Sequence, residues 1–497
     1  MSSPQWRERA QHSSFKTDGF IGGRYVPLRP SERTFDTVNP ATGERLATFP
    51  AGSAEDVDSA VKVARSAFEK HWAGSAPEYR KQCLLKFAAL VESRAADFAL
   101  LDSLEMGKPV KMALGELALA VRFLRFYAES ADKVYGEVAP TDPARGLTLT
   151  LREPYGVVGA IVPWNFPMML ACMAIGPALA AGNTVVIKPS EVSPSSALLL
   201  AEVATAAGLP DGVLNVVPGL GATVGAALAL HMDVDKLHFT GSTTTGRKML
   251  EYAGQSNGKS VMLEVGGKSP QIVFREAVDI PGLAESLAAS VFFNTGQVCV
   301  ARSRLLVEES IADEIVSGIR AAAGVYSGGD PLDERSVCGP VASRAQLQRV
   351  TAYVDGARKS GAELALGTGA GRDGDGFFFD PVVLRRVEPQ MAVVREEIFG
   401  PVLAVSTFKE DDAAVTLANS TAFGLAATAW TRDLDRALKL ARRIDAGRIE
   451  IRAAAAPRAS IEQYSAEPFR GSGHGVVGGM RGLEAYVRHK AVEFIHG

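Results

Sequence analysis

The sequence predicts an α/β protein in which parallel sheets carry helices on both faces. From Gly156 onward, short apolar runs with the length of buried strands alternate with helical segments. Repeated strand–helix–strand units build a parallel sheet, because each crossover brings the next strand into the same direction. Residues 270–450 repeat the alternation and predict a second α/β unit. A chain of 497 residues is also too long for one ordinary core, so two or three packed units are expected.

The first 155 residues predict helices followed by one exposed strand. Helical periodicity covers residues 56–70, 79–103 and 109–136. Apolar and polar residues then alternate from Leu147 to Arg152, as in a strand with one polar face. We expect this strand at the edge of a sheet, where it would form a subunit contact.

Five apolar runs predict the strands of the first sheet. They lie at residues 157–162, 184–187, 213–217, 236–239 and 261–264. Ser193 and Pro194 have the pattern of a cap and first turn for the helix that Gly208 ends. Further along we expect strands at 271–274 and 304–308, helices near 282–294 and from Ile311, a loop at 366–380, and a terminal strand at 486–495.

Composition indicates an ordinary globular protein and disfavours several kinds of partner. Hydrophobic residues make up 47% and charged residues 22%, with a net charge of −3 and a pI near 6.2. This balance favours neither nucleic acid nor an anionic membrane surface. Secretory and membrane-spanning patterns are not found, and the four cysteines lack metal-ligand spacing. We therefore expect a cytoplasmic protein with reduced thiols and no metal.

Cys299 and Glu264 form the strongest candidate for a catalytic pair. Cys299 follows Asn294-Thr295-Gly296 at a break after a helical segment, and Glu264 ends an apolar strand. A thiolate is a good covalent catalyst, and a nearby carboxylate can activate water. Ligands bind beyond the carboxyl ends of parallel strands, which favours a functional Glu264. The alternatives are a buried structural cysteine and a solvated strand end.

Glycine-rich turns at strand ends indicate a dinucleotide site. Gly241 and Ser242 lead into a helix whose first amides and hydroxyls can hold a phosphate, although a plain turn is the alternative. Arg247-Lys248 stands where a Walker A loop needs lysine and serine or threonine. Gly221 and Gly225 belong to a near match to GxGxxG, which is weak by itself.

Two further strand ends carry polar groups suited to a cofactor and a reaction centre. Lys188 and Glu191 can both reach ribose hydroxyls, and a carboxylate there favours NAD, although NADP is not excluded. Asn165 can donate its side-chain amide to an oxyanion, or it can cap a helix.

These motifs, in this order, resemble the aldehyde dehydrogenase superfamily. The resemblance runs from Val38 to about Leu440, and up to Phe274 it is most similar to bacterial gamma-glutamyl-aminobutyraldehyde and related aminoaldehyde dehydrogenases. It implies NAD-dependent oxidation of an aldehyde to its acid through a cysteine thiohemiacetal and thioester. The motifs are Pro163-Trp164-Asn165-Phe166-Pro167, Lys188-Pro189-Ser190-Glu191, Phe239-Thr240-Gly241-Ser242-Thr243, Leu263-Glu264 with Gly266-Gly267-Lys268, Gly296-Gln297-Val298-Cys299, and Glu396-Glu397-Ile398-Phe399-Gly400-Pro401.

The resemblance also implies roles for single residues. Cys299 would be the nucleophile, Glu264 the base for deacylation, and Asn165 with the Cys299 backbone N–H the oxyanion hole. The cofactor site is expected to contain Trp164, Lys188, Glu191, Gly221, Gly225, Gly241, Ser242, Glu397 and Phe399. The substrate tunnel is expected to contain Phe166, Met169, Leu170, Met173 and Phe293, although such residues are more often core.

The resemblance divides the chain into parts with separate tasks. Residues 1–134 and 155–265 would bind NAD, and residues 266–453 would form the catalytic domain. Residues 135–154 and 478–497 would be oligomerisation strands, and 454–477 a loop at the substrate mouth. We expect a homodimer or a homotetramer.

The chain departs from the family pattern at several positions. Ala174 replaces a lysine and Val477 a glutamate that relay protons in some members, so we expect Glu264 to exchange protons directly with solvent. Arg302 replaces a usual glycine, and Arg452 replaces a usual asparagine before a longer loop.

The aldehyde itself stays open at this point. Glu116 offers a weak site for an amine, whereas Arg452, Arg458 and Arg470 offer one for a carboxylate. A CoA-acylating semialdehyde dehydrogenase is a second function, although such enzymes typically lack the glutamate found at Glu264. A non-catalytic NAD-binding descendant is a third.

Overall fold

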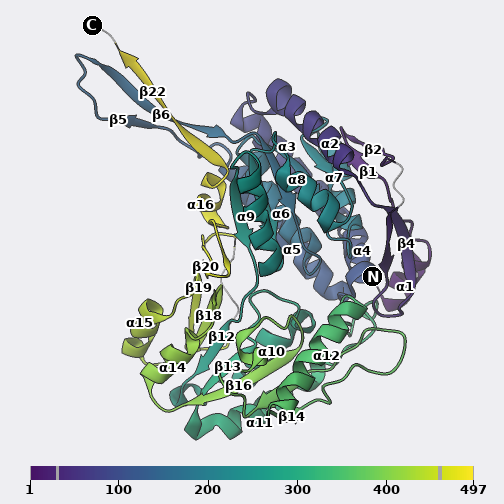
Figure 1. Ribbon diagram of the computed structural model, residues 1–497, viewed down its shortest axis with the longest axis vertical. Coiled ribbons are helices and arrows are strands. Elements are labelled where there is room, and N and C mark those ends of the chain that lie inside the picture. Colours follow the sequence, from purple (N-terminus) through teal and green to yellow (C-terminus); the bar gives the residue numbers. More distant parts are fainter. Residues whose placement is uncertain (1, 30–32, 457–461, 496–497) are drawn as a thin grey trace.

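A computed structural model describes residues 2–29, 33–456 and 462–495. Two α/β units, each built on its own sheet, face one another, and a long hairpin-like arm projects from the first (Figure 1). The expected α/β class with two principal sheets and small accessory sheets is therefore confirmed. Within the described residues, no helix is long and apolar enough to cross a membrane.

The first sheet has the strand order β2-β1-β9-β8-β7-β10-β11-β21. Its five inner strands are parallel, whereas β1, β2 and β21 run antiparallel to their neighbours. The strands are β1 Gly19–Ile21, β2 Arg24–Val26, β7 Val157–Ile161, β8 Thr184–Lys188, β9 Leu214–Val216, β10 Lys236–Thr240, β11 Ser260–Glu264 and β21 Gly473–His474.

Helices cover both faces of this sheet because successive side chains of a strand point to opposite sides. Val158 and Ala160 of β7 pack in the core beneath α3, α5, α6 and α7, while Val157 and Ile161 pack beneath α2, α8 and α9. The helices are α2 Ala54–Ala67, α3 Pro77–Ser93, α4 Ala95–Met106, α5 Val110–Ser130, α6 Pro167–Ala180, α7 Ser195–Ala206, α8 Ala226–Leu230 and α9 Thr243–Gln255.

The second sheet has the order β14-β15-β16-β13-β12-β18-β19 and is parallel except at β14. Its strands are β12 Pro270–Val273, β13 Arg304–Glu308, β14 Glu363–Leu366, β15 Val382–Arg385, β16 Val402–Phe408, β18 Ala426–Trp430 and β19 Arg448–Arg452. Its helices are α10 Leu283–Phe292, α11 Ala312–Ala322, α12 Arg344–Lys359, α13 Ala392–Arg395, α14 Asp411–Ala418 and α15 Leu434–Arg443.

The remaining elements lie outside the two large sheets. They are α1 Ser3–Gln11, the hairpin of β3 Thr34–Val38 with β4 Arg45–Pro50, the pair β17 Phe423–Gly424 with β20 Phe469–Arg470, α16 Gly479–Glu484, and the arm strands β5 Glu137–Ala139, β6 Gly146–Pro154 and β22 Val487–Ile495.

Three local expectations were wrong. The helix expected at 79–103 is two helices, which break at Arg94. Ser193 does not cap α7, and within the described residues its hydroxyl has no partner. Glu105 of α4 caps that helix instead, because its carboxylate accepts hydrogen bonds from the Ser195 backbone N–H and hydroxyl at 3.1 and 2.7 Å.

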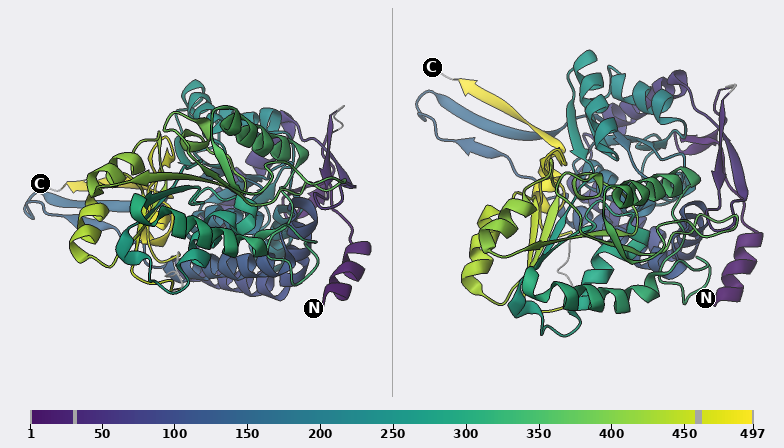
Figure 2. Two further views of the ribbon diagram at one scale, coloured as in Figure 1. Left: turned by 90° about the horizontal axis from the view of Figure 1, so that it is seen from below. Right: turned by 60° about the horizontal axis from the view of Figure 1, so that its bottom comes forward.

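The third error concerns the arm, where β6 is the central strand and not an edge. The order is β22-β6-β5, and β22 pairs with β6 along its whole length (Figures 1 and 2). The local pattern around Leu147 cannot reveal this, because the partner strand lies more than 300 residues later. Leu147 is paired with Phe494, and both side chains are exposed.

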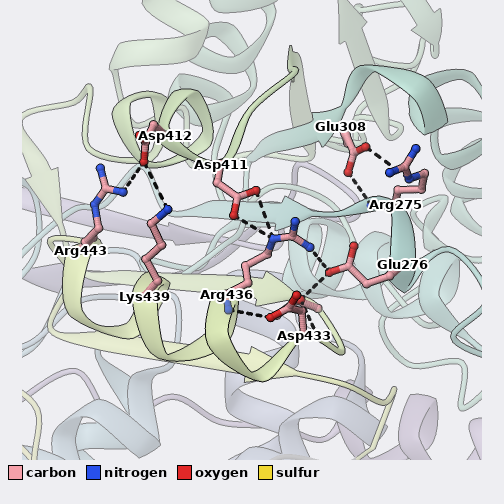
Figure 3. A network of polar contacts seen from close by, with 10 residues as sticks. Arg275, Glu276, Glu308, Asp411, Asp412, Asp433, Arg436, Lys439 and Arg443 are labelled. Atoms are coloured by element: carbon pink, nitrogen blue, oxygen red, sulfur yellow. Dashed lines mark hydrogen bonds and ion pairs between the residues drawn. The ribbon is translucent and has the colours of Figure 1, made fainter.

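An ion-pair network ties α15 to the rest of the second unit (Figure 3). Arg436 Nε donates to Asp411 of α14 at 3.1 to 3.2 Å, and its Nη1 contacts Glu276 after β12. The guanidinium also lies 4.3 Å from the centre of the Phe274 ring. All three charged groups are less than half exposed, so solvent screens this cluster less than an ordinary surface pair.

We expect Arg436→Met to lower the free energy of unfolding by about 1 to 2 kcal/mol, because two carboxylates lose their shared cation. Lys439→Met on the same helix is the matched control. Its pair with Asp412 spans 3.7 Å between exposed groups, so its effect should stay within about 0.5 kcal/mol. Thermal unfolding at one scan rate measures both, and equal midpoints for the two variants would contradict the importance of the network.

Candidate active site

Cys299 and Glu264 lie together in the wall that separates two cavities. The first cavity, of about 210 Å³, lies beyond the carboxyl ends of β7, β10 and β11 and is closed by residues of the second unit, including Glu397 and Phe399. The second, of about 170 Å³, is mainly apolar. Both cavities are lined by Cys299, Glu264 and Leu170. A group in either cavity can therefore reach the same thiol and carboxylate.

A strained turn positions Cys299. After α10 the backbone is left-handed at Asn294, Thr295 and Gly296, with φ of 50°, 56° and 69°. A Cβ on Gly296 would lie 2.2 Å from the backbone of Gly400, so only glycine fits. The turn is locked from outside, since Thr295 Oγ1 donates to the Gly339 carbonyl at 3.0 Å. Cys299 is partly exposed, whereas the other three cysteines are buried.

The surroundings of Cys299 favour the neutral thiol. Burial, assisted by the negative charges of Glu397 and Glu264, raises the pKa of Cys299 to about 12. A cation placed beside Sγ would lower this pKa by opposing the two carboxylates. At neutral pH the Cys299 thiol therefore keeps its proton.

Asn165 lies in the loop between β7 and α6, close to the nucleophile turn. It is buried, and its Nδ2 donates a hydrogen bond of 3.0 Å to the carbonyl of Gln297. Asn294 Nδ2 in turn donates to the Asn165 carbonyl at 3.1 Å. Asn165 is not the cap of α6, which begins after Phe166. Asn165 and Cys299 line the same cavity, and the Asn165 amide has a second hydrogen besides the one donated to Gln297.

Glu264 ends β11 with a carboxylate that is poorly solvated. Within the described residues its Oε1 is buried and has no hydrogen-bond partner. Burial, assisted by the negative charge of Glu467, raises the pKa of Glu264 to about 8. The raised pKa makes the ionised carboxylate a stronger base, and it also leaves most of the group protonated at neutral pH.

The first cavity has the polar and flat groups that suit a nicotinamide dinucleotide. Glu397 accepts a hydrogen bond from the Gly267 backbone N–H at 3.2 Å, and a Cβ on Gly266 would lie 2.3 Å from this carboxylate. Trp164 and Phe399 pack edge to face with ring centres 5.3 Å apart. Gly241 and Ser242 line the same cavity at the start of α9.

The other expected cofactor residues lie beside this cavity, beyond the end of β8. Lys188 Nζ is 3.0 Å from Glu191 Oε2, and Glu191 Oε1 accepts from the Gly221 backbone N–H. Gly221 and Gly225 bound a short π-helical turn that precedes α8. Burial lowers the pKa of Lys188, which Glu191 partly offsets. A cation and an acceptor at one strand end fit a ribose diol.

Only part of the expected tunnel lines the apolar cavity. Met169, Leu170 and Met173, on one face of α6, lie there with Cys299. Phe166 and Phe293 instead stack with ring centres 6.3 Å apart and line a separate pocket of about 430 Å³. The two hollows share Met169.

The structure adds residues to the lining of the apolar cavity. Tyr464, Ala466, Glu467 and Pro468 lie within the expected substrate-mouth loop at 454–477. The lining residues that the sequence did not assign to this cavity are Phe123, His238, Thr240, Val265, Val300, Leu425, Arg448 and Gly478. His238 carried a signal, since a histidine inside an apolar strand needs partners when it is buried. Its Nδ1 lies 2.7 Å from the Tyr486 hydroxyl and its Nε2 3.2 Å from Thr240 Oγ1. Burial and the charge of Lys236 lower its pKa to about 3, so His238 is neutral.

The arginines proposed for a substrate carboxylate have other partners. Arg452 pairs with Glu450 at 3.5 Å and stacks 4.8 Å from the Trp430 ring. Arg470 contacts Asp445 and donates to the Asn419 carbonyl at 2.7 Å. Arg458 lies outside the described residues.

The structure also shows the surroundings of three other positions that depart from the family pattern. Arg302 is buried and donates to Thr428 Oγ1 at 2.8 Å. Ala174 is buried in the core of the first unit, and Val477 lines the apolar cavity. Glu116, the weak amine site, is buried against Lys108 and also accepts from the Met169 backbone N–H at 3.2 Å.

The model of the aldehyde dehydrogenase family matches residues 28–492. The chain belongs to this family. As a member it is an oxidoreductase that oxidises aldehydes to carboxylic acids with NAD(P), which confirms the reaction class expected from the motifs.

Individual relatives resemble this aldehyde dehydrogenase over nearly their whole length. It is 45% identical over 446 residues to the NADP/NAD-dependent aldehyde dehydrogenase PuuC of Escherichia coli K12, covering 89% of each chain. A gamma-glutamyl-gamma-aminobutyraldehyde dehydrogenase structure from Burkholderia cenocepacia has a TM-score of 0.94 at 40% identity, over 99% of each chain. The structure of the P. syringae indole-3-acetaldehyde dehydrogenase AldA, a mutant with NAD+ and IAA, has a TM-score of 0.96 at 41% identity over 100% of each chain.

The carboxylate of Glu191 leads to a prediction about cofactor preference. A 2′-phosphate on the adenosine ribose would meet this negative charge, so Glu191→Gln should raise kcat/KM for NADP relative to NAD by about tenfold. Glu251→Gln, an exposed carboxylate on α9, is the control and should leave the ratio unchanged. Steady-state kinetics with both cofactors measure the ratio, and an unchanged ratio in Glu191→Gln would place the ribose elsewhere.

Proposed function

We propose that Cys299, Glu264 and Asn165 carry out the oxidation through a covalent thioester. The observation that supports this most directly is the shared wall, in which the thiol and the carboxylate are reached from both cavities. The residues of the first cavity would hold the dinucleotide, and the apolar cavity would hold the aldehyde. When bound, NAD(P) supplies the hydride acceptor and a positive charge near Sγ.

The acylation half-reaction uses the thiolate and the amide. Sγ of Cys299 attacks the aldehyde carbon and forms a C–S bond, while the carbonyl electrons move to oxygen. The second amide hydrogen of Asn165 and the Cys299 backbone N–H stabilise this oxyanion. Loss of the hydride then leaves a thioester on Cys299.

The deacylation half-reaction uses Glu264. The carboxylate takes one proton from a water molecule as its oxygen bonds to the thioester carbon. Collapse of the tetrahedral intermediate breaks the C–S bond and returns the Cys299 thiolate, and the product leaves as an acid. A CoA-acylating reaction would not need such a base, so the position of Glu264 supports hydrolysis.

The apolar cavity favours an aldehyde that has no charged group close to its carbonyl carbon. Met169, Leu170 and Met173 offer apolar surface beside Cys299, and methionines adapt to ligands of different shape. Arg452, Arg470 and Glu116, which could select a charged substrate, are paired with other residues. We therefore favour a neutral aliphatic or aromatic aldehyde, with NAD as the better cofactor and NADP as a slower one.

We also propose that the arm joins subunits into a homodimer or homotetramer. Paired strands place Val138, Leu147, Leu149, Val492 and Phe494 on one face of the arm. Val138 is 69% exposed and Phe494 is 54% exposed, which is unusual for apolar residues on a projecting sheet. A second copy that covers this face would remove the apolar surface from water.

Substitution of the nucleophile tests the assignment. Cys299→Ala should reduce NADH formation by about a thousandfold or more across aliphatic, aromatic, amino and carboxylated aldehydes, because no thioester can form. It should still bind NAD, which quenching of protein fluorescence can detect. Cys83→Ala, a buried cysteine far from the cavities, is the control and should keep its activity. Activity that survives in Cys299→Ala would refute the covalent route.

Substitutions that introduce charge on the arm test the proposed subunit contact. Leu147→Glu combined with Phe494→Glu should convert the oligomer into smaller species, because buried carboxylates at the interface cost several kcal/mol. Light scattering after gel filtration gives the mass. Leu438→Glu, an exposed leucine on α15, is the control and should keep the parent mass.

A further inference from the structure

A second carboxylate, Glu467, lies in the wall of the apolar cavity together with Glu264. The two differ in their contact with solvent. Glu264 Oε1 is buried and unpartnered within the described residues, whereas Glu467 is exposed. The pair therefore extends from the position where water must be activated to the solvent outside the cavity.

Backbone pairing holds Glu467 next to the end of β11. Strand β21 runs antiparallel to β11 and places Gly473 opposite Glu264. Two residues later, the Gly475 backbone N–H donates to Glu467 Oε1 at 3.2 Å. Gly475 itself packs so tightly on Met262 of β11 that a Cβ would lie 2.9 Å from Met262 Cγ. The carboxylate is thus anchored to the strand that carries Glu264.

The other titratable groups around the two carboxylates have fixed partners or lie on other sides. His238 of β10 is held between Tyr486 and Thr240. Arg448 of β19 pairs with Glu450 at 2.6 Å and stacks 4.9 Å from the Tyr464 ring. Cys299 and Glu397 border Glu264 on the side of the first cavity.

We propose that Glu467 is a proton-transfer residue, which takes the proton from Glu264 after deacylation and passes it to solvent. This proposal rests on the proposed function of Glu264. During deacylation Glu264 receives one proton from water. That proton moves to the Glu467 carboxylate, directly or through one water molecule, and the Glu264 carboxylate is restored. Glu467 then releases the proton to buffer, so each turnover returns both groups to their starting state.

The environment makes such a transfer necessary. Because the pKa of Glu264 is raised to about 8, its protonated form is stable at neutral pH and would block the next deacylation. Ala174 and Val477 are apolar and cannot accept the proton. Among the described residues that line the apolar cavity, Glu467 is the exposed carboxylate. Its negative charge also raises the pKa of Glu264, which shows that the two carboxylates interact electrostatically.

The test is the rate at which the acyl-enzyme decays in Glu467→Gln. The enzyme is mixed with NAD and a neutral aldehyde, quenched with acid at intervals, and the mass of the acylated protein is followed. We expect the burst of NADH to keep its rate, while decay of the acyl-enzyme slows by about tenfold or more. Glu484→Gln on α16 removes an exposed carboxylate outside the cavity and is the matched control.

Two further readouts separate proton transfer from a structural role. Decay should speed up with pH through the pKa of Glu264, and in Glu467→Gln this rise should move to lower pH, because the neighbouring negative charge is gone. Formate or imidazole in the buffer should restore part of the lost rate in Glu467→Gln and none in the control. Glu467→Asp should keep part of the activity.

The outcomes distinguish failure of the proton-transfer proposal from failure of the proposed function on which it rests. If no acyl-enzyme forms on Cys299 in the unaltered protein, the proposed function fails. If it forms, and decays equally fast in Glu467→Gln, the proton-transfer role alone is refuted. A raised KM for amino aldehydes with unchanged decay would instead make Glu467 a substrate-binding residue, and it would likewise overturn the proposal.

Discussion

The turn that carries Cys299 is the constraint on which the site depends, because it joins the two units at the reaction centre. Asn294 donates to the carbonyl of Asn165, and Asn165 donates to the carbonyl of Gln297. These reciprocal hydrogen bonds connect the loop after β7 in the first unit to the turn after α10 in the second. The left-handed backbone at residues 294–296 is costly, and it persists because neighbouring segments leave no alternative. Asn165 and the turn that carries Cys299 are thereby held together.

Burial at this junction explains the electrostatic character of the site. Carboxylates at positions 264 and 397 border the thiol and add to the effect of burial in raising the pKa of Cys299. Burial also raises the pKa of Glu397 to about 7 and that of Glu264 to about 8, so Cys299 is neutral and Glu264 is mostly protonated at neutral pH. The protonated state of Glu264 also creates the need for a path by which a proton can leave, which the segment around Glu467 can meet.

The candidate catalytic residues could be named from the sequence, whereas the lining of the apolar cavity could be named only in part. Cys299, Glu264 and Asn165 follow strand or helix ends within short motifs, so local sequence identifies them. Met169 and Met173 could also be predicted from the sequence, because they share a face of one helix. Phe293 was expected in the tunnel from its position relative to the motifs, and it lines a pocket that shares Met169 with the apolar cavity. Glu467 comes from a distant segment that joins the first sheet only through β21.

The sequence by itself determined the α/β class, the alternation of strands and helices along the chain and the reaction class, because these depend on local periodicity and on motifs at strand ends. The tertiary structure alone decided that β6 is a central strand, that Glu105 caps α7 and that Glu467 lies in the same wall as Glu264. Each of these contacts joins segments far apart in the chain. Their partners follow from how helices and sheets pack, so the sequence near either residue does not identify the other.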